Sequence, residues 1–131
     1  MTEFIPVNEP RLAGKEGEYL AECIQSGWVS SEGPFVSRFE SEFAEMTGRR
    51  FGIAVSTGTA ALDVAVAALR LGPGDEVIVP TFAIISCVSA IVKARATPVL
   101  VDCAPDSFNI DTDLIRGLVT ARTRAIMVVH T

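Results

Sequence analysis

Short apolar segments alternate with helical patterns through most of the chain. The predicted strands are 51–55, 76–79, 99–101 and 124–129, and helices are expected over 59–71, over 83–94 and from a cap at Asp111. Strands that are apolar at nearly every position are typical of parallel sheets, which have helices packed on both faces. The sequence therefore predicts an α/β fold with a mostly parallel central sheet and helices on both of its faces.

Two amphipathic helices are expected before the first strand. Each has its apolar residues on one side of a helical projection and is followed by a glycine, a common helix stop. The residues are Leu12, Tyr19, Leu20, Cys23 and Ile24, ending at Gly27, and Val36, Phe39, Phe43 and Met46, ending at Gly48. We therefore expect a helical segment over 1–50, with a turn-rich loop at 28–34, and an incomplete α/β domain over 51–131.

The first predicted strand leads into Ser56-Thr-Gly-Thr59, a turn of small residues at the start of a helix. The first N–H groups of a helix have no partner inside it, and the helix dipole makes that end partly positive. Small residues let an anion approach these N–H groups, and the hydroxyls can add hydrogen bonds. The turn is therefore a candidate phosphate site. The alternative is an ordinary helix capped by Ser56 or Thr57.

Charge and cysteine content disfavour several kinds of site. The net charge is −5 and the basic residues are scattered, which disfavours nucleic acid as a partner. The three cysteines form no Cys-x-x-Cys pair and accompany a single histidine, so we expect neither disulfides nor a metal site, and reduced thiols in a cytoplasmic protein. The apolar runs are too short to span a membrane. Dinucleotide and nucleoside-triphosphate motifs are missing.

Seven motifs, taken in their order and spacing, give the chain a resemblance to a known family. They are Trp28–Phe35, Phe39-Glu40, Ser56–Leu62, Gly72–Thr81, Ala96–Asp102, Phe108–Asp111 and Thr123–His130. In these motifs the chain resembles the DegT/DnrJ/EryC1/StrS family of pyridoxal-phosphate sugar aminotransferases, with perosamine synthases as the nearest kind. The resemblance implies the N-terminal part of an aspartate-aminotransferase-like large domain, with 51–131 as its cofactor-binding part.

By this resemblance the cofactor is pyridoxal phosphate. Thr57, Gly58 and Thr59 would lie under its phosphate, with Gly58 and Thr59 offering backbone N–H groups. The family presents an aromatic ring to the pyridine face at the position of Ile84, so the chain departs from the family there. Isoleucine covers the ring by apolar contact but lacks the stacking contribution, about 0.5–1.5 kcal/mol for an aromatic pair. Phe82 is near in sequence and is expected to pack elsewhere in the core.

The resemblance also places Trp28, Ser30 and Gly33, in the loop 28–34, near the sugar substrate. A turn anchored by a partly buried tryptophan is the alternative for this loop. His130 follows a predicted strand, at the carboxyl edge where open α/β sheets bind their ligands. The favoured interpretation of His130 is nevertheless a structural histidine that the neighbouring backbone satisfies.

The reactive centre of the family lies outside this chain. The lysine that forms the Schiff base with the cofactor, and the acidic residue that pairs with the pyridine nitrogen, both come later in the family than residue 131. Neither Lys15 nor Lys93 matches the lysine motif. We therefore expect the chain to be the N-terminal portion of a longer protein, with no catalytic residue of its own and no activity in isolation.

The resemblance implies a homodimeric enzyme that transfers an amino group from glutamate to a nucleotide-linked keto-deoxy sugar, for deoxyamino sugar and polysaccharide biosynthesis. Two alternatives stay open. Some relatives have histidine in place of the lysine and dehydrate keto sugars with the same cofactor. A domain that kept the sheet and lost the centre would be a binding or regulatory domain. The residue at the missing lysine position would discriminate among these functions.

Overall fold

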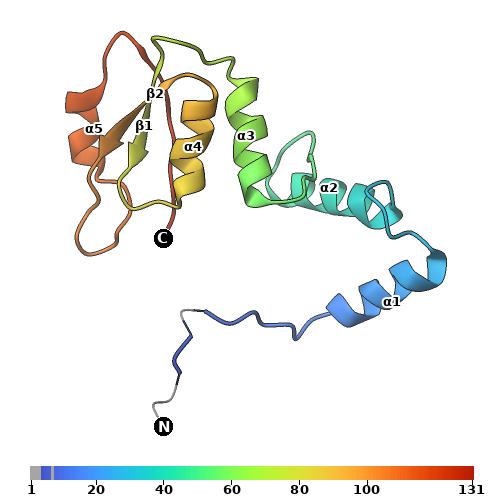
Figure 1. The fold of residues 1–131 in the computed structure, drawn as a ribbon. Coiled ribbons are helices and arrows are strands. Elements are labelled where there is room, and N and C mark those ends of the chain that lie inside the picture. The colour runs from blue at the N-terminus through green and yellow to red at the C-terminus, as the bar shows by residue number, and fades with distance from the viewer. Residues whose placement is uncertain (1–3, 7) are drawn as a thin grey trace. The chain divides into compact units, whose positions relative to one another are not determined.

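The computed structural model describes residues 4–6 and 8–131. They belong to two compact units, Met1–Ala54 and Val55–Thr131 (Figure 1). The first unit contains two helices, α1 (Glu16–Ser26) and α2 (Pro34–Met46). The second contains α3 (Gly58–Ala68), β1 (Glu76–Pro80), α4 (Ile85–Lys93), β2 (Thr97–Val101), α5 (Thr112–Leu118) and β3 (Thr123–Ile126).

Both helices of the first unit stop where their glycines predict. α1 is capped by Gly27, which adopts a left-handed φ of 75° and donates its N–H to the Ile24 carbonyl. α2 begins with a proline at its first position and is followed by Gly48, which also has a positive φ. Part of each apolar stripe is less buried than expected: Phe39 and Phe43 are exposed and stack on each other at 5.6 Å.

The segment 51–55, which we predict to be a strand, is extended but unpaired in the structure. A strand needs a hydrogen-bonded neighbour, and within the described residues this segment has none. Its backbone is held instead by α2, because the Ala54 N–H donates to the Glu40 carboxylate at 2.8 Å. The side chains of Phe51 and Ile53 are accordingly exposed. The predicted strand is therefore wrong for this chain as it stands.

The sheet has the strand order β2-β1-β3, and both strand pairs are parallel. Every residue of β1 is buried, as expected for the central strand of a covered sheet. β2 begins at Thr97, two residues before its predicted start at Val99, and Pro98 lies on this edge strand, where the missing N–H is tolerated. β3 ends at Ile126, although the Met127 N–H still donates to the Ile78 carbonyl at 2.8 Å.

The connections reverse direction within this sheet. From β1 the chain moves through α4 to β2, and from β2 it returns through α5 to β3 on the far side of β1. Because such crossovers are right-handed, the reversal puts α4 and α5 on opposite faces of the sheet (Figure 1). The predicted α/β fold is confirmed. The reversal also makes the carboxyl ends of β1 and β3 a topological switch point, the usual ligand site of open α/β sheets.

The core of the second unit lies between the sheet and α4. Its buried members are Val77, Val79, Cys87, Ile91 and Ala96. α3 packs on α4, and Lys93 forms an ion pair with Asp63 across the two helices at 2.7 Å. α3 is less buried than its composition predicts: Val66 is its one buried residue. Within the described ranges, none of the helices has both the length and the apolar character needed to cross a bilayer.

Candidate functional site

The turn before α3 combines a helix cap with free backbone donors. Thr57 is the N-cap, and its hydroxyl accepts the Ala60 N–H at 3.1 Å while its carbonyl accepts the Ala61 N–H at 3.0 Å. Of the two predicted caps, Ser56 and Thr57, the structure therefore has Thr57. The N–H groups of Gly58 and Thr59 donate to no atom of the described residues, and the turn is exposed. Two helix N–H groups consequently point at solvent, as an anion site requires.

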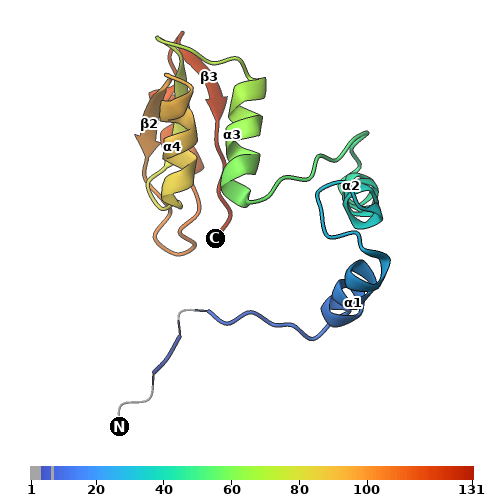
Figure 2. The same ribbon diagram turned by 45° about the vertical axis from the view of Figure 1, so that its right-hand side comes forward.

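A second helix begins beside this turn. The Thr59 hydroxyl oxygen lies 3.0 Å from the hydroxyl oxygen of Ser86, in the first turn of α4. The N-terminal ends of α3 and α4 therefore meet at the carboxyl edge of the sheet, an arrangement visible in both ribbon views (Figures 1 and 2). A Cβ built on Gly58 would meet no atom within 4 Å, so no side chain crowds the Cα of this residue. Two partly positive helix ends border that edge.

An open hollow lies at the switch point between β1 and β3. It has a volume of about 400 Å³, and the residues that line it follow β1 or continue from β3: Thr81, Phe82, Ala83, Ile84, Val129, His130 and Thr131. Ile84, the predicted ring-covering residue, is the N-cap of α4 and is 67% exposed. His130 is exposed and its imidazole makes no hydrogen bond within the described residues. The interpretation of His130 as a histidine satisfied by backbone is therefore not supported.

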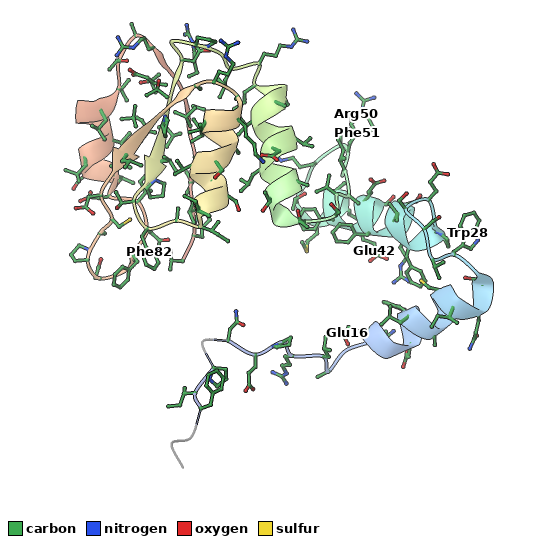
Figure 3. The ribbon with its side chains drawn as sticks, in the orientation of Figure 1. Glu16, Trp28, Glu42, Arg50, Phe51 and Phe82 are labelled. Carbon is green, nitrogen blue, oxygen red and sulfur yellow. The ribbon has the colours of Figure 1, made fainter. Side chains whose placement is uncertain are left out.

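A loop from β2 to α5 braces this edge of the sheet, and the sequence did not reveal it as part of the site. The Phe108 ring lies 5.1 Å from the ring of Phe82, which Figure 3 shows at the carboxyl edge. The Asn109 side chain accepts the Thr131 N–H at 2.9 Å. The loop thus contacts the segments that follow both β1 and β3. Its only sequence signal was the Phe108–Asp111 motif, and Asp111 is the N-cap of α5, as predicted.

The predicted sugar-binding residues belong to the other unit. Trp28, Ser30 and Gly33 lie in the loop between α1 and α2, where Figure 3 shows the indole of Trp28. Gly33 is the N-cap of α2, and a Cβ on it would lie 3.3 Å from the Trp28 Cβ. Trp28 is 49% exposed, so its ring is only half covered by this unit. The assignment of this loop to the substrate stays a prediction.

The edge formed by the second unit suits a ligand with an anionic end and a flat apolar part. The free N–H groups and two hydroxyls are hydrogen-bond donors of the kind that bind phosphate, and they are neutral, so the positive field comes from the helix ends. The hollow at the same edge of the sheet is lined largely by apolar side chains. A phosphorylated aromatic compound matches this combination of a donor cluster and an apolar wall.

Comparison with known proteins gives a match along nearly the whole chain. Residues 10–131 match the model of the DegT/DnrJ/EryC1/StrS aminotransferase family. Over 126 residues the chain is 46% identical to a GDP-perosamine synthase of Caulobacter vibrioides. These residues make up 96% of this chain and 34% of that relative. The chain therefore spans about a third of the length of the curated relatives it matches.

Two solved structures extend the comparison to three dimensions. Spr1654 of Streptococcus pneumoniae, in its PLP form, is 34% identical and superimposes with a TM-score of 0.81, covering 93% of this chain and 31% of that one. The GDP-4-keto-6-deoxy-D-mannose-3-dehydratase of E. coli, with bound hydrated PLP, is 26% identical with a TM-score of 0.84 and covers 94% and 33%. Both share the sheet and helices described above.

Proposed function

The chain belongs to the DegT/DnrJ/EryC1/StrS aminotransferase family, and from this premise we propose that it is the N-terminal part of an enzyme that transfers an amino group to a nucleotide-linked keto-deoxy sugar. Glutamate is the proposed amino donor. The similarity to a GDP-perosamine synthase supports a sugar nucleotide as the acceptor. We also propose that the protein is a cytoplasmic homodimer and that it acts in deoxyamino sugar and polysaccharide biosynthesis.

The observation that carries this proposal is the pair of free N–H groups at Gly58 and Thr59, at the edge of the sheet that also has an apolar hollow. The cofactor is pyridoxal phosphate, and this donor set fits its phosphate because a dianion needs donors and no acceptors. In the proposal, Thr57 caps the helix while Gly58 and Thr59 bind the phosphate. Ile84 covers one face of the ring. When bound, the cofactor supplies the electron sink for amino transfer.

The loop between the first two helices contributes the sugar contacts in this proposal. Trp28 offers a half-exposed ring against which a sugar or base can pack, and Ser30 offers a hydroxyl. Gly33 keeps the main chain near Trp28 free of a side chain. Residues 1–50 then form a helical segment with a substrate loop, and 51–131 form the cofactor-binding part of a larger domain.

A labelling experiment tests the proposed function. The full-length protein that contains this chain is incubated with pyridoxal phosphate, glutamate labelled in its amino nitrogen, and GDP-4-keto-6-deoxy-D-mannose. This sugar nucleotide is the compound that gives the dehydratase relative its name. We expect mass spectrometry to find the label in the sugar nucleotide. Omitting glutamate is the matched control and should abolish the product. A sugar nucleotide without label, in the presence of bound cofactor, would contradict amino transfer.

The similarity to a dehydratase supports a second candidate, dehydration of the same kind of keto sugar. The same experiment separates the two functions. Dehydration would leave the sugar nucleotide without the label and would remove a hydroxyl oxygen from it, whereas amino transfer replaces the keto oxygen by nitrogen. The residue that occupies the cofactor-lysine position of the full-length protein gives an independent answer, since lysine favours the first function and histidine the second.

A further inference from the structure

Ser86 has no assigned part in binding the cofactor, yet its side chain contacts Thr59, which is a proposed phosphate-binding residue. Its hydroxyl oxygen lies 3.0 Å from that of Thr59, and either oxygen can be the donor. Ser86 is in the first turn of α4 and is half-buried, and Thr59 is in the first turn of α3. The contact therefore links the two helix ends that border the proposed phosphate site.

A bound phosphate would fix the direction of this hydrogen bond. A hydroxyl has one proton to donate and two lone pairs that accept. A phosphate dianion only accepts hydrogen bonds. The Thr59 hydroxyl can therefore contact it only by donating its single proton. The Thr59 oxygen is then free to accept, and Ser86 becomes the donor of the pair. Hydrogen bonds in such a chain polarise one another, which strengthens the bond to the anion.

We propose that Ser86 is a positioning residue of the cofactor phosphate site, donating to Thr59 so that the Thr59 proton points at the phosphate. The inference rests on the proposed function, because it needs a phosphate-bearing cofactor at this turn. Ser86 itself need not touch the ligand. Its effect should therefore depend on both the phosphate of the ligand and the hydroxyl of Thr59.

Equilibrium binding of two ligands to the full-length protein tests the inference. Pyridoxamine phosphate and pyridoxamine differ only in the phosphate, and neither needs a protein lysine to bind. We expect Ser86→Ala to weaken pyridoxamine phosphate about two- to tenfold, the range for one neutral hydrogen bond. Pyridoxamine binding should be unchanged. In a Thr59→Val background, Ser86→Ala should cause no further loss, because its partner is gone.

The matched control is Ser89→Ala, on the same helix, since the Ser89 hydroxyl makes no hydrogen bond within the described part of the chain. It should leave the affinity for both ligands unchanged. Melting curves establish that each variant is folded. If Ser86→Ala does not fold, Ser86→Cys replaces it, because a thiol is a weak donor of similar size.

The outcomes separate this inference from the proposed function. If the wild-type protein does not prefer pyridoxamine phosphate to pyridoxamine, the proposed function fails and the inference with it. If the wild-type protein shows that preference and Ser86→Ala keeps it in full, only the inference is overturned. Equal losses for both ligands would also overturn it, since they would indicate a structural role without dependence on the phosphate.

Discussion

Gly52 shows how a single residue fixes the approach of one segment to another. It lies in the extended segment after α2, and a Cβ built at this position would collide with the carbonyl oxygen of Glu40. The Glu40 carboxylate also accepts the Ala54 N–H. Glu40 thus contacts the segment twice, once through its side chain and once through a close backbone approach that only glycine permits. The requirement is steric, because Gly52 has no positive φ.

We therefore expect Gly52→Ala to destabilise the protein by about 1–3 kcal/mol, the usual cost of overpacking. Urea unfolding of the full-length protein measures this change. Gly117→Ala is the control, because Gly117 lies in α5 with no atom within 4 Å of a built Cβ. The control should be neutral or stabilising by about 0.5–1 kcal/mol, since alanine favours a helix. Equal stability of the two variants would contradict the steric argument.

Ile84 is the residue at which we expect the chain to depart from its family, and its exposed side chain can be substituted without disturbing the core. Its side chain is 67% exposed and lines the hollow at the carboxyl edge. An aromatic ring there would add an offset-stacking contribution of about 0.5–1.5 kcal/mol to ring binding. We expect Ile84→Phe to tighten pyridoxamine phosphate binding accordingly, as measured by calorimetric titration.

The control for Ile84 is its neighbour Ile85, which is also exposed but does not line the hollow. Ile85→Phe should leave the affinity unchanged. Weaker binding by Ile84→Phe would indicate that the isoleucine makes room for the ligand and does not cover it. That result would remove Ile84 from the proposed cofactor site while leaving the phosphate end intact.

At the scale of elements, the sequence predicted those structural features that depend only on the residues of the segment itself. The strands of the sheet were predictable because their apolar runs suit burial on both faces, and the cap at Thr57 was predictable because its side chain acts on its own helix. The strand at 51–55 was not, because strand formation depends on a neighbour that the segment does not contain. The contact between Thr59 and Ser86 depends on how α3 packs against α4, which no local pattern encodes.

The start of β1 is joined to the start of β3 by an ionic cluster at the amino edge of the sheet. The Glu76 carboxylate is buried, and it accepts hydrogen bonds from the Thr120 hydroxyl and from the Arg122 guanidinium, the latter at 2.8 Å. These bonds, that of Thr120 first, lower the pKa of Glu76 below its ordinary value of 4.5. The carboxylate form is thus favoured by folding.

This cluster predicts how stability depends on pH. The pKa of Glu76 is lower in the folded than in the unfolded chain, so its contribution is complete above about pH 4.5 and is lost as the pH falls through the folded value. We expect Glu76→Gln to be less stable than the wild type at neutral pH and to lose less stability on acidification. Melting temperatures at several pH values measure this difference.

Glu45→Gln is the control for the acid effect, because Glu45 is exposed and forms no ion pair in the described part of the chain. Its melting temperatures should follow those of the wild type at every pH. Asp75, whose pKa is also lowered, by the Gly72 N–H and then by Arg124, keeps some acid sensitivity in both variants. Parallel curves for Glu76→Gln and the wild type would contradict the assigned role of Glu76.

At the scale of the whole molecule, the chain offers the phosphate end of the proposed site. Its free N–H groups and its apolar hollow lie at the carboxyl edge of the sheet, whereas many large apolar side chains elsewhere are exposed. Exposed apolar surface on this scale is typical of a surface that other protein covers. The matched relatives are about three times as long as this chain. We propose that the part of such a relative that this chain does not span supplies both the protein that covers this surface and the reactive lysine.

If the reactive lysine lies outside this chain, residues 1–131 alone should transfer no amino group. The reaction needs a primary amine beside the cofactor, and Lys93 is badly placed for it. Lys93 is the last residue of α4, whereas Ile84 directly precedes the first, so nine helical steps of about 1.5 Å, roughly 13 Å in all, separate them. The Lys93 ammonium is also bound to Asp63 at 2.7 Å. Lys15 lies before α1, outside the cofactor motifs.

The labelled-glutamate experiment, repeated with the isolated chain at equal concentration, checks this prediction against the full-length protein. We expect the label in the sugar nucleotide with the full-length protein only, because neither lysine of the isolated chain is placed to move a proton at the reacting carbon. Lys93→Met and Lys15→Met variants of the isolated chain then test whether either lysine is the reactive amine. If the isolated chain transfers the label and either substitution abolishes that transfer, the reactive amine lies within residues 1–131, and the assignment of the reactive centre to the remainder of the protein is wrong.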